Sequence, residues 1–220
     1  MARTSTKASE KAEPNVALDA AEEKTTYTFS AAPAKLQNDY KTRAKVAKFY
    51  KVSYEQWKKD MHDCGLHLPE PQMKQAYDSI KLPERATAGS AGYDFFSPIP
   101  FAISNLNAAP RGFTFPTGIR CEMNESYCLL LIPKSGLGIK QYSRLGKVVA
   151  CIDADYIYAG NEGDILINIR SDIPGNPPVH INVGQAVCQG VFVQYGKTDD
   201  DDATELTREQ RKGGLGSTGK

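Results

Sequence analysis

The sequence lacks several features that would assign it to a class at once. No apolar run reaches the roughly 20 residues of a membrane-spanning helix. Residues 1–25 contain neither the apolar segment of a secretory signal peptide nor the acid-poor composition of a transit peptide. The formal net charge is +1, so no excess of one sign indicates a nucleic acid or a membrane surface as partner. These absences predict a cytoplasmic protein with neither of those partners.

Cysteine and histidine are also scarce. The 5 cysteines form no CxxC pair and the 3 histidines show no zinc-ligand spacing, which argues against a built-in structural metal. Cys128, Cys151 and Cys188 lie within apolar runs, where cysteine behaves as a small hydrophobic residue. This usage is typical of a reducing compartment.

The composition changes along the chain and predicts four parts. Residues 1–34 have too few large apolar side chains to offset the entropy of ordering, so we expect a disordered tail. Residues 35–79 form a basic and aromatic extension, and residues 80–198 form a β domain. Residues 199–220 form an acidic hinge followed by a glycine-rich arm.

Within the extension, residues 46–52 predict a short strand, and Ser53 is a suitable N-cap for a helix over residues 54–62. Basic residues in this region are interleaved with aromatic ones, a composition that suits a nucleic-acid surface. A solvated helix whose Trp57 and tyrosines pack on the β domain explains the same composition. We favour this second interpretation.

The rest of the chain has a β pattern. Short apolar or alternating runs recur between Pro, Gly, Asn and Asp, and no amphipathic helix is recognisable among them. Many short strands with long-range connections predict an all-β jelly roll or a related barrel. The expected strands are residues 93–96, 112–115, 127–132, 148–152, 165–169, 179–183 and 187–195.

Two segments of the β domain combine polar groups with glycine. Asp94 follows Gly92 and Tyr93, and its carboxylate either fixes a turn or serves a site. Lys134, Ser135 and Gly136 directly follow an expected strand, and a cation, a hydroxyl and a close backbone approach together suit a phosphate. The spacing is not that of a Walker loop, and we expect no helix after it.

Three further features have both a structural and a functional interpretation. Asp153 and Asp155 are two apart on a chain expected to be extended, so their carboxylates point the same way; either they form turns, or one activates a water beside the flat wall of Tyr156. Gln189 interrupts an apolar strand and must be hydrogen-bonded or face a ligand. The glycine-rich residues 212–220 suit either a flap that closes over phosphates or a plain linker.

Taken in order, these segments resemble the five motifs of the trimeric dUTP diphosphatase (dUTPase) family. The resemblance covers about residues 80–220 and is greatest to bacterial and phage members with an insertion in the third motif, here residues 157–163. The matching segments are Ala91-Gly92-Tyr93-Asp94, Pro133-Lys134-Ser135-Gly136, Ile152-Asp153-Ala154-Asp155-Tyr156, residues 184–191 and residues 213–219.

The resemblance implies a fold, a reaction and residue roles. The fold is a dUTPase-like β jelly roll (β-clip) that forms a homotrimer with exchanged C-terminal arms. The reaction is hydrolysis of dUTP to dUMP and pyrophosphate, with Mg²⁺ held by the triphosphate and waters rather than directly by protein ligands. Asp153 matches the carboxylate that activates water, and Asp94 matches a second carboxylate near the metal. The implied substrate-binding positions are Lys134, Ser135, Gly136, Lys147, Ile152, Tyr156, Gln189, Arg211, Gly214, Leu215, Gly216, Ser217 and Thr218.

Four positions depart from the family pattern. Lys134 and Ala186 stand where the family usually has Arg, Leu215 stands where it has a Phe that stacks on the base, and Ala150 replaces a Gly before the catalytic Asp. These changes lie around the phosphates and the base, so two alternatives stay open beside dUTP hydrolysis. One is a dNTP diphosphatase that prefers dCTP or a modified dUTP, and the other is a nucleotide-gated interaction module.

Overall fold

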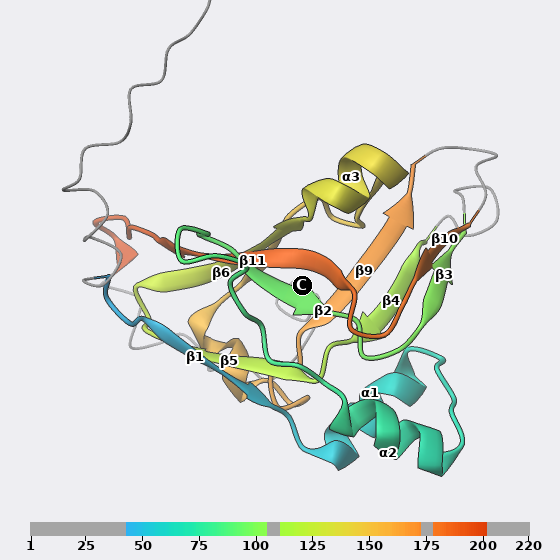
Figure 1. Cartoon of the computed structure of the whole chain (residues 1–220). Coiled ribbons are helices and arrows are strands. Elements are labelled where there is room, and N and C mark those ends of the chain that lie inside the picture. The colour runs from blue at the N-terminus through green and yellow to red at the C-terminus, as the bar shows by residue number, and fades with distance from the viewer. Residues whose placement is uncertain (1–42, 105–110, 173–177, 202–220) are drawn as a thin grey trace, which may run out of the picture. The chain divides into compact units, whose positions relative to one another are not determined.

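The protein was analysed as a computed structural model, which describes residues 43–104, 111–172 and 178–201 (Figure 1). The predicted disordered tail and residues 202–220, which include the whole glycine-rich segment, lie outside these residues. The strands within them are β1 (Ala47–Lys51), β2 (Tyr93–Phe96), β3 (Phe101–Ile103), β4 (Phe113–Pro116), β5 (Ile119–Met123), β6 (Tyr127–Pro133), β7 (Ser143–Leu145), β8 (Ala150–Ile152), β9 (Leu166–Ser171), β10 (Val179–Ile181) and β11 (Ala186–Gln194). The helices are α1 (Tyr54–Asp63), α2 (Glu70–Asp78), α3 (Ser135–Gln141) and the 3₁₀ helix η3 (Ala154–Tyr158).

The largest sheet has the strand order β2-β11-β6-β8, and all of its pairs are antiparallel. Residues alternate between its two faces because the side chains of a strand point to opposite sides in turn. Phe95 and Leu131 face the core, where both are almost completely buried. Asp94 and Gln189 are paired across β2 and β11 and therefore lie on the opposite, outer face. The remaining strands form a three-stranded sheet, β4-β9-β7, and the pairs β1-β5 and β3-β10.

The N-terminal extension shares the hydrophobic core of the β domain. β1 pairs with β5 along its whole length, as Ala47 faces Met123 and Lys51 faces Ile119. Helix α1 buries Trp57 completely, and the Trp57 Nε1 donates a hydrogen bond to the carbonyl of Pro116 at 3.2 Å. The expectation that Trp57 packs on the β domain is therefore confirmed, which leaves this ring unavailable to nucleic acid.

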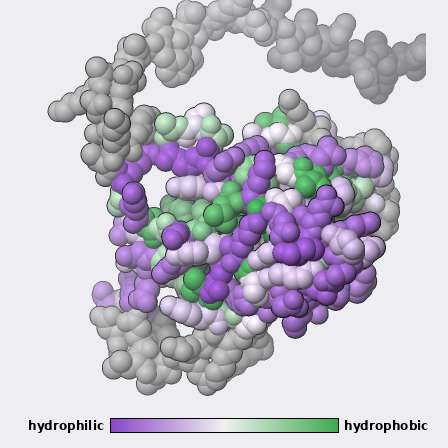
Figure 2. All heavy atoms as spheres, turned by 60° about the horizontal axis from the view of Figure 1, so that its bottom comes forward, coloured by the Kyte–Doolittle hydropathy of each residue, from purple (hydrophilic) through white to green (hydrophobic). Residues whose placement is uncertain are grey.

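The outer side of the extension is polar. Figure 2 views the molecule from the side of α1 and α2 and shows a surface dominated by hydrophilic residues, with apolar patches between them. Apolar side chains of the two helices point inward instead, and Met61 and Met73 are fully buried with Trp57. Helix α1 starts as expected, because the Ser53 hydroxyl accepts a hydrogen bond from the Gln56 amide at 3.2 Å.

The structure corrects several expectations about local elements. A helix, α3, does follow Lys134, although Gly136 and Gly138 weaken its intrinsic propensity. It is anchored by tertiary packing, since Leu137 is buried. Helix α2 and strands β3, β5 and β7 were also not predicted. The chain after Asp153 is not extended, because it turns directly into η3.

Candidate functional site

Three residues from separate sequence motifs meet on the outer face of the large sheet. The Lys134 ammonium forms an ion pair with the Asp94 carboxylate, whose side chain is only 15 % exposed. Gln189 is the register partner of both Asp94 on β2 and Ile132 on β6, and Lys134 lies two residues beyond Ile132 on the same face. The strand order thus gathers a carboxylate, a cation and an amide, and we call them the sheet cluster.

Gly92 makes room for this cluster. A Cβ atom at position 92 would lie 2.6 Å from Gln189 Oε1, closer than Cβ atoms come to such neighbours. A side chain there would displace the Gln189 amide from its place beside Asp94. The glycine of the first motif is therefore explained by close packing against the fourth motif.

A shallow cavity of about 250 Å³ adjoins the sheet cluster. Lys134 and Gly136 line one side of it, and Gln185 and Ala186 line the other. Ser135 is exposed at the start of α3. The cavity therefore brings the second and fourth motifs together, and the small Ala186 side chain leaves space where a longer cation would fit.

Asp153 lies elsewhere on the surface, in a second cavity of about 510 Å³ that we call the acidic cavity. Four acids and one lysine give this cavity its charge: Glu122, Glu125, Asp153, Asp155 and Lys197. Asp153 and Asp155 both line it, but the extended chain predicted to align their carboxylates is a 3₁₀ turn instead. The Asp153 residue is exposed, so water reaches it freely.

The thiol of Cys151 is the neighbour of Asp153. Its Sγ donates to Asp153 Oδ1 at 3.7 Å. The pKa of Cys151 is raised to about 12. The largest cause is burial of the sulfur, and the adjacent Cys128 thiol and the Asp153 carboxylate add to it. Cys151 therefore stays a neutral donor at physiological pH and does not compete with Asp153 as a base.

The sheet cluster and Asp153 are too far apart in one chain to act on one atom. Ile152 pairs with Leu129 on β6, four strand positions short of Pro133, and β8 is three strands away from β2. With ~3.3 Å per residue and ~4.8 Å per strand, Asp94 and Asp153 are separated by roughly 20 Å across the outer face. A single chain does not combine the predicted catalytic residues at one point.

Tyr156 is held tightly by its own chain. Its side chain is 6 % exposed, and its hydroxyl donates to the carbonyl of Asp164 at 3.0 Å. The Asn161 amide donates to the Tyr156 hydroxyl at 3.3 Å and to the same carbonyl at 2.9 Å. The ring is thus a rigid surface with a small exposed part.

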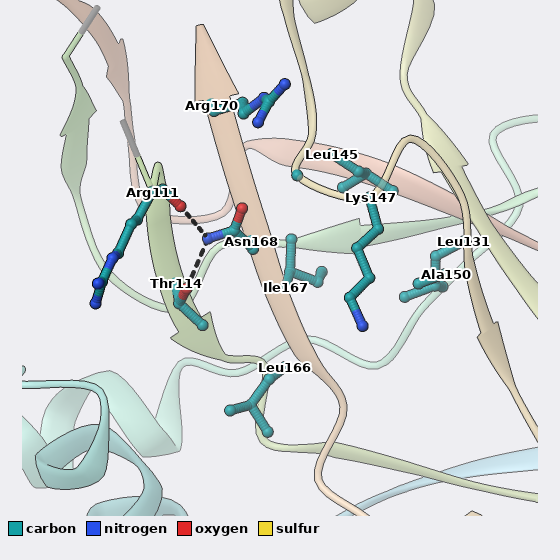
Figure 3. Close-up of a pocket in the computed structure, with 11 residues that line it drawn as sticks. Arg111, Thr114, Leu131, Leu145, Lys147, Ala150, Leu166, Ile167, Asn168 and Arg170 are labelled. Carbon is teal, nitrogen blue, oxygen red and sulfur yellow. Dashed lines mark hydrogen bonds between the residues drawn. The ribbon is translucent and has the colours of Figure 1, made fainter. Parts of the chain in front are cut away.

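The hairpin before Asp153 borders a third cavity, of about 410 Å³ (Figure 3). We call it the hairpin cavity. Leu145, Lys147 and Ala150 line it from the hairpin, and Figure 3 shows Lys147 extending into the space between the hairpin and β9. Leu131 and Ile167 add an apolar floor. Of the predicted hairpin residues, Lys147 therefore lines this cavity, whereas Ile152 does not.

Sequence reasoning missed Asn168 and Arg170 in the hairpin cavity. The Asn168 amide donates to the Thr114 hydroxyl at 2.7 Å and to the Arg111 carbonyl at 3.0 Å, as drawn in Figure 3. Both residues alternate along β9 with the buried Ile167 and Ile169. That alternation was visible in the sequence and could have indicated a polar face turned away from the core.

Several predicted site residues are not covered by this geometry. Arg211, Gly214, Leu215, Gly216, Ser217 and Thr218 lie outside the described residues. Among the residues that are described, no group of three or more His, Cys, Asp or Glu side chains forms a metal cage. No helix in the described part of the chain is both long and apolar enough to cross a membrane.

Comparison with known proteins agrees with the motif order. The dUTPase family model matches residues 78–219. A deoxyuridine 5'-triphosphate nucleotidohydrolase of Dictyoglomus turgidum is 33% identical over 141 residues, covering 64% of this chain and 91% of that protein. The same enzyme from Enterobacter sp. (strain 638) is 31% identical over 167 residues, covering 73% of this chain and 99% of its own.

Among solved structures, a dUTPase from Streptococcus mutans is 30% identical, with a TM-score of 0.47 over 56% of this chain and 91% of that one. The predicted all-β fold class is confirmed by the strands described above. The family model includes all five predicted motifs, and the resemblance that these motifs carried is confirmed. The chain belongs to the dUTPase family.

Proposed function

We propose that this protein hydrolyses dUTP to dUMP and pyrophosphate. One observation carries the proposal: Asp94, Lys134 and Gln189, which come from three separate family motifs, converge on one face of the large sheet. A cation and an amide beside a carboxylate suit phosphate oxygens with an associated metal. The family relationship supplies the substrate, since the curated relatives carry the name deoxyuridine 5'-triphosphate nucleotidohydrolase.

In the proposed reaction Asp153 is the general base. Its exposed carboxylate takes a proton from a water whose oxygen attacks the α-phosphorus, and the bond from that phosphorus to the bridging oxygen of pyrophosphate breaks. A carboxylate is a weak base in bulk water, so its effect depends on holding the water close to phosphorus. The neutral Cys151 thiol helps to orient the carboxylate through its contact with Oδ1.

We infer that a complete site needs more than one copy of the chain. The separation of about 20 Å between Asp94 and Asp153 prevents both from reaching one α-phosphate within a chain. A second copy would bring its own sheet cluster against the acidic cavity, so that Lys134 supplies positive charge where Asp153 and its neighbours supply negative charge. The homotrimer expected for the family satisfies this need, with Arg211, Ser217 and Thr218 of an exchanged arm closing over the phosphates.

The residues fit Mg²⁺ held mainly by the substrate. Mg²⁺ prefers oxygen ligands and usually keeps several waters, with one or two carboxylates and phosphates completing its shell. Asp94 offers one such carboxylate, and the described residues provide no complete protein cage. Asp94 would therefore hold the waters around the ion, and the bound ion would neutralise charge that develops on the triphosphate.

The hairpin and Tyr156 are the proposed base and sugar subsites. The hairpin cavity has an apolar floor and polar groups at its rim, which suits a pyrimidine ring. Tyr156 is fixed by two hydrogen bonds, so its exposed part forms an unyielding wall beside the sugar and leaves no room for a 2′-hydroxyl. Ala150 lines the hairpin cavity and adds a methyl group where the family has glycine. This change next to the base keeps dCTP as an alternative substrate.

The test is pyrophosphate release from dUTP, dCTP, dTTP and UTP. We expect turnover of dUTP to exceed that of the others and to fall at least about 10²-fold in Asp153→Asn, because loss of a positioned base has this magnitude. Asp155→Asn is the matched control, since both acids line the acidic cavity and only Asp153 is given a catalytic role. If the protein binds a nucleotide but hydrolyses none of the four, the proposal of an enzyme is wrong and an interaction module is the better interpretation. If Asp153→Asn released pyrophosphate from dUTP as fast as Asp155→Asn does, Asp153 would not be the general base.

A further inference from the structure

The insertion that follows Tyr156 is tied to the start of helix α1. Glu162 accepts hydrogen bonds from the Ser53 amide at 2.8 Å and from the Ser53 hydroxyl at 2.7 Å. Arg120 donates to the carbonyl of Ile157 at 3.1 Å, at the other end of the same insertion. The two bonds from Ser53 to Glu162 join the family domain to an extension that precedes residue 78, where the family match begins, whereas the Arg120 bond lies within the family domain.

A second connection lies beneath the first and consists of two buried acids. Asp60 on α1 is 5 % exposed, and Asp164, the residue directly after the insertion, is 0 % exposed. Asp60 Oδ1 accepts a hydrogen bond from the side-chain amide Nε2 of Gln56 at 2.9 Å, and Asp164 Oδ1 accepts one from the backbone amide of Gly118 at 2.9 Å. The two carboxyl groups also interact with each other through their side chains.

The remaining oxygens of this pair need a donor. Asp60 Oδ2 and Asp164 Oδ2 are buried, and no donor group among the described residues reaches them. Two buried carboxylates side by side repel each other, whereas a carboxylic acid donates a hydrogen bond to its neighbour. Burial raises the pKa of Asp164 well above its usual range, and the charge of Asp60 raises it further. Burial likewise raises the pKa of Asp60.

Asp164 also fixes the ring proposed to contact the sugar. Its backbone carbonyl accepts the hydrogen bonds of the Tyr156 hydroxyl and the Asn161 amide. A shift of Asp164 would therefore move the anchor of Tyr156. Helix α1, although remote in sequence from the family motifs, is linked to Tyr156 through Asp60 and Asp164.

We propose that one proton shared between Asp60 and Asp164 holds α1 against the insertion and so makes both acids positioning residues for Tyr156. This inference rests on the proposed function for its catalytic part alone. The other titratable groups facing the pair are the exposed Lys59 and Asp63 on α1 and the half-buried Cys64 that follows the helix. Lys59 forms an ion pair with Asp63 at 3.0 Å, and neither side chain reaches the unpartnered oxygens of the buried pair.

The first test is the pH dependence of thermal unfolding of the full chain. A carboxyl whose pKa is raised by folding adds stability below its unfolded pKa of about 4, and this stability is lost as pH rises through the folded value. The wild type should therefore lose Tm by about 3–5 °C per pH unit within that window, which reflects one proton bound on folding. The double variant Asp60→Asn with Asp164→Asn removes the titration and should show a flatter profile. Asp63→Asn on the same helix should follow the wild type.

The second test measures discrimination between dUTP and UTP. Asp60→Ala leaves Asp164 without its partner, and the kcat/KM ratio for dUTP over UTP should fall about tenfold, because Tyr156 loses its fixed position. Asp60→Asn restores a hydrogen-bond donor and should bring the ratio back toward that of the wild type. A purely structural role would lower activity toward both nucleotides equally and leave the ratio unchanged.

The outcomes separate this inference from the proposed function. If the wild type hydrolyses no dUTP, the proposed function fails, while the pH profile still tests the shared proton. The inference is overturned if the Tm of the wild type falls no more steeply with rising pH than the Tm of the double variant. A Tm that falls on addition of EDTA also overturns it, because a cation rather than a proton would then bridge the two acids.

Discussion

At the scale of single residues, the ion pair between Lys134 and Asp94 links two roles. Without substrate, the ammonium is neutralised by the carboxylate beside it. A triphosphate would compete for the same ammonium and free Asp94 to hold waters around Mg²⁺. The guanidinium usual in the family has several donors in a planar fork and serves two acceptors at once, whereas an ammonium acts as a point charge. In the proposed mechanism, Lys134 would therefore couple substrate binding to release of Asp94.

Val148 shows strain at a single residue of the hairpin. Its φ is 65°, in the left-handed region that β-branched side chains avoid, and its side chain is 53 % exposed. The side chain therefore gains little from packing while the backbone is held in an unfavourable conformation. Strain of this kind often lies at binding sites, and this turn connects Lys147 with Ala150 of the hairpin cavity.

We expect Val148→Gly to raise the free energy of unfolding by about 1 kcal/mol, since glycine adopts positive φ without strain. Urea unfolding followed by circular dichroism measures the change. Val149→Gly is the matched control: Val149 is similarly exposed and is not among the residues with positive φ, so glycine there should destabilise. Equal effects of the two substitutions would contradict the interpretation of strain.

At the scale of elements, the extension behaves as part of the β domain. β1 adds a partner to β5, and Phe49 on β1 packs edge-to-face against Phe95 with ring centroids 5.6 Å apart. α1 covers the end of β4 with Trp57. Gly118 adjoins this ring so closely that a Cβ atom there would lie 3.1 Å from it. The extension and the β domain are thus stabilised together.

Trp57→Ala should therefore destabilise the whole β domain, by about 3–5 kcal/mol, because it removes a fully buried ring and leaves a cavity. Thermal and urea unfolding should show a single transition at lower Tm, rather than separate loss of a helix. Lys59→Ala, an exposed change on the same helix, should alter stability by less than about 0.5 kcal/mol. A Trp57 variant with an unchanged β-domain transition would show that the extension folds independently.

Much of this element pattern was readable from the sequence. The strands at 93–96 and 127–132 and the capped helix after Ser53 follow from local alternation and from one hydroxyl, so they were predicted closely. β3 and β7 are three residues long, too short for an alternation to be recognised. α3 contains two glycines in seven residues, and packing of Leu137 overrides its weak local propensity.

At the scale of the whole molecule, the proposed mechanism requires assembly, because the sheet cluster and Asp153 are roughly 20 Å apart in one chain. In this proposal, each chain carries two incomplete halves of the site on one outer face of the large sheet. A closed ring of identical chains joins the half of one copy to the complementary half of the next, and repeats the same site around its axis. Activity should then require the oligomer, and each variant should affect only one half of each site.

Mixed oligomers test this arrangement. Asp153→Asn and Lys134→Ala should each be strongly impaired, but chains of the two variants assembled together in equal amounts should regain about a quarter of the wild-type activity, because that fraction of sites draws both intact residues from different copies. Asp94→Asn mixed with Lys134→Ala is the control, since both residues belong to the same half and no mixed site is intact. Recovery in the control, or none in the test, would contradict a shared site.

The sequence by itself determined the family, the order of the motifs and the chemical character of the proposed residues, because short motifs and strand alternation are local properties. The tertiary structure decided which of these residues are neighbours in space. Pairing of β2 with β11 and β6 brought Asp94, Lys134 and Gln189 together, and the same register kept Asp153 at a distance. Asp60 and Asp164 are 104 positions apart in the sequence and interact in a buried environment. No local sequence pattern predicts such a pair. Burial and strand register depend on the entire chain, which is why they became visible only in the folded molecule.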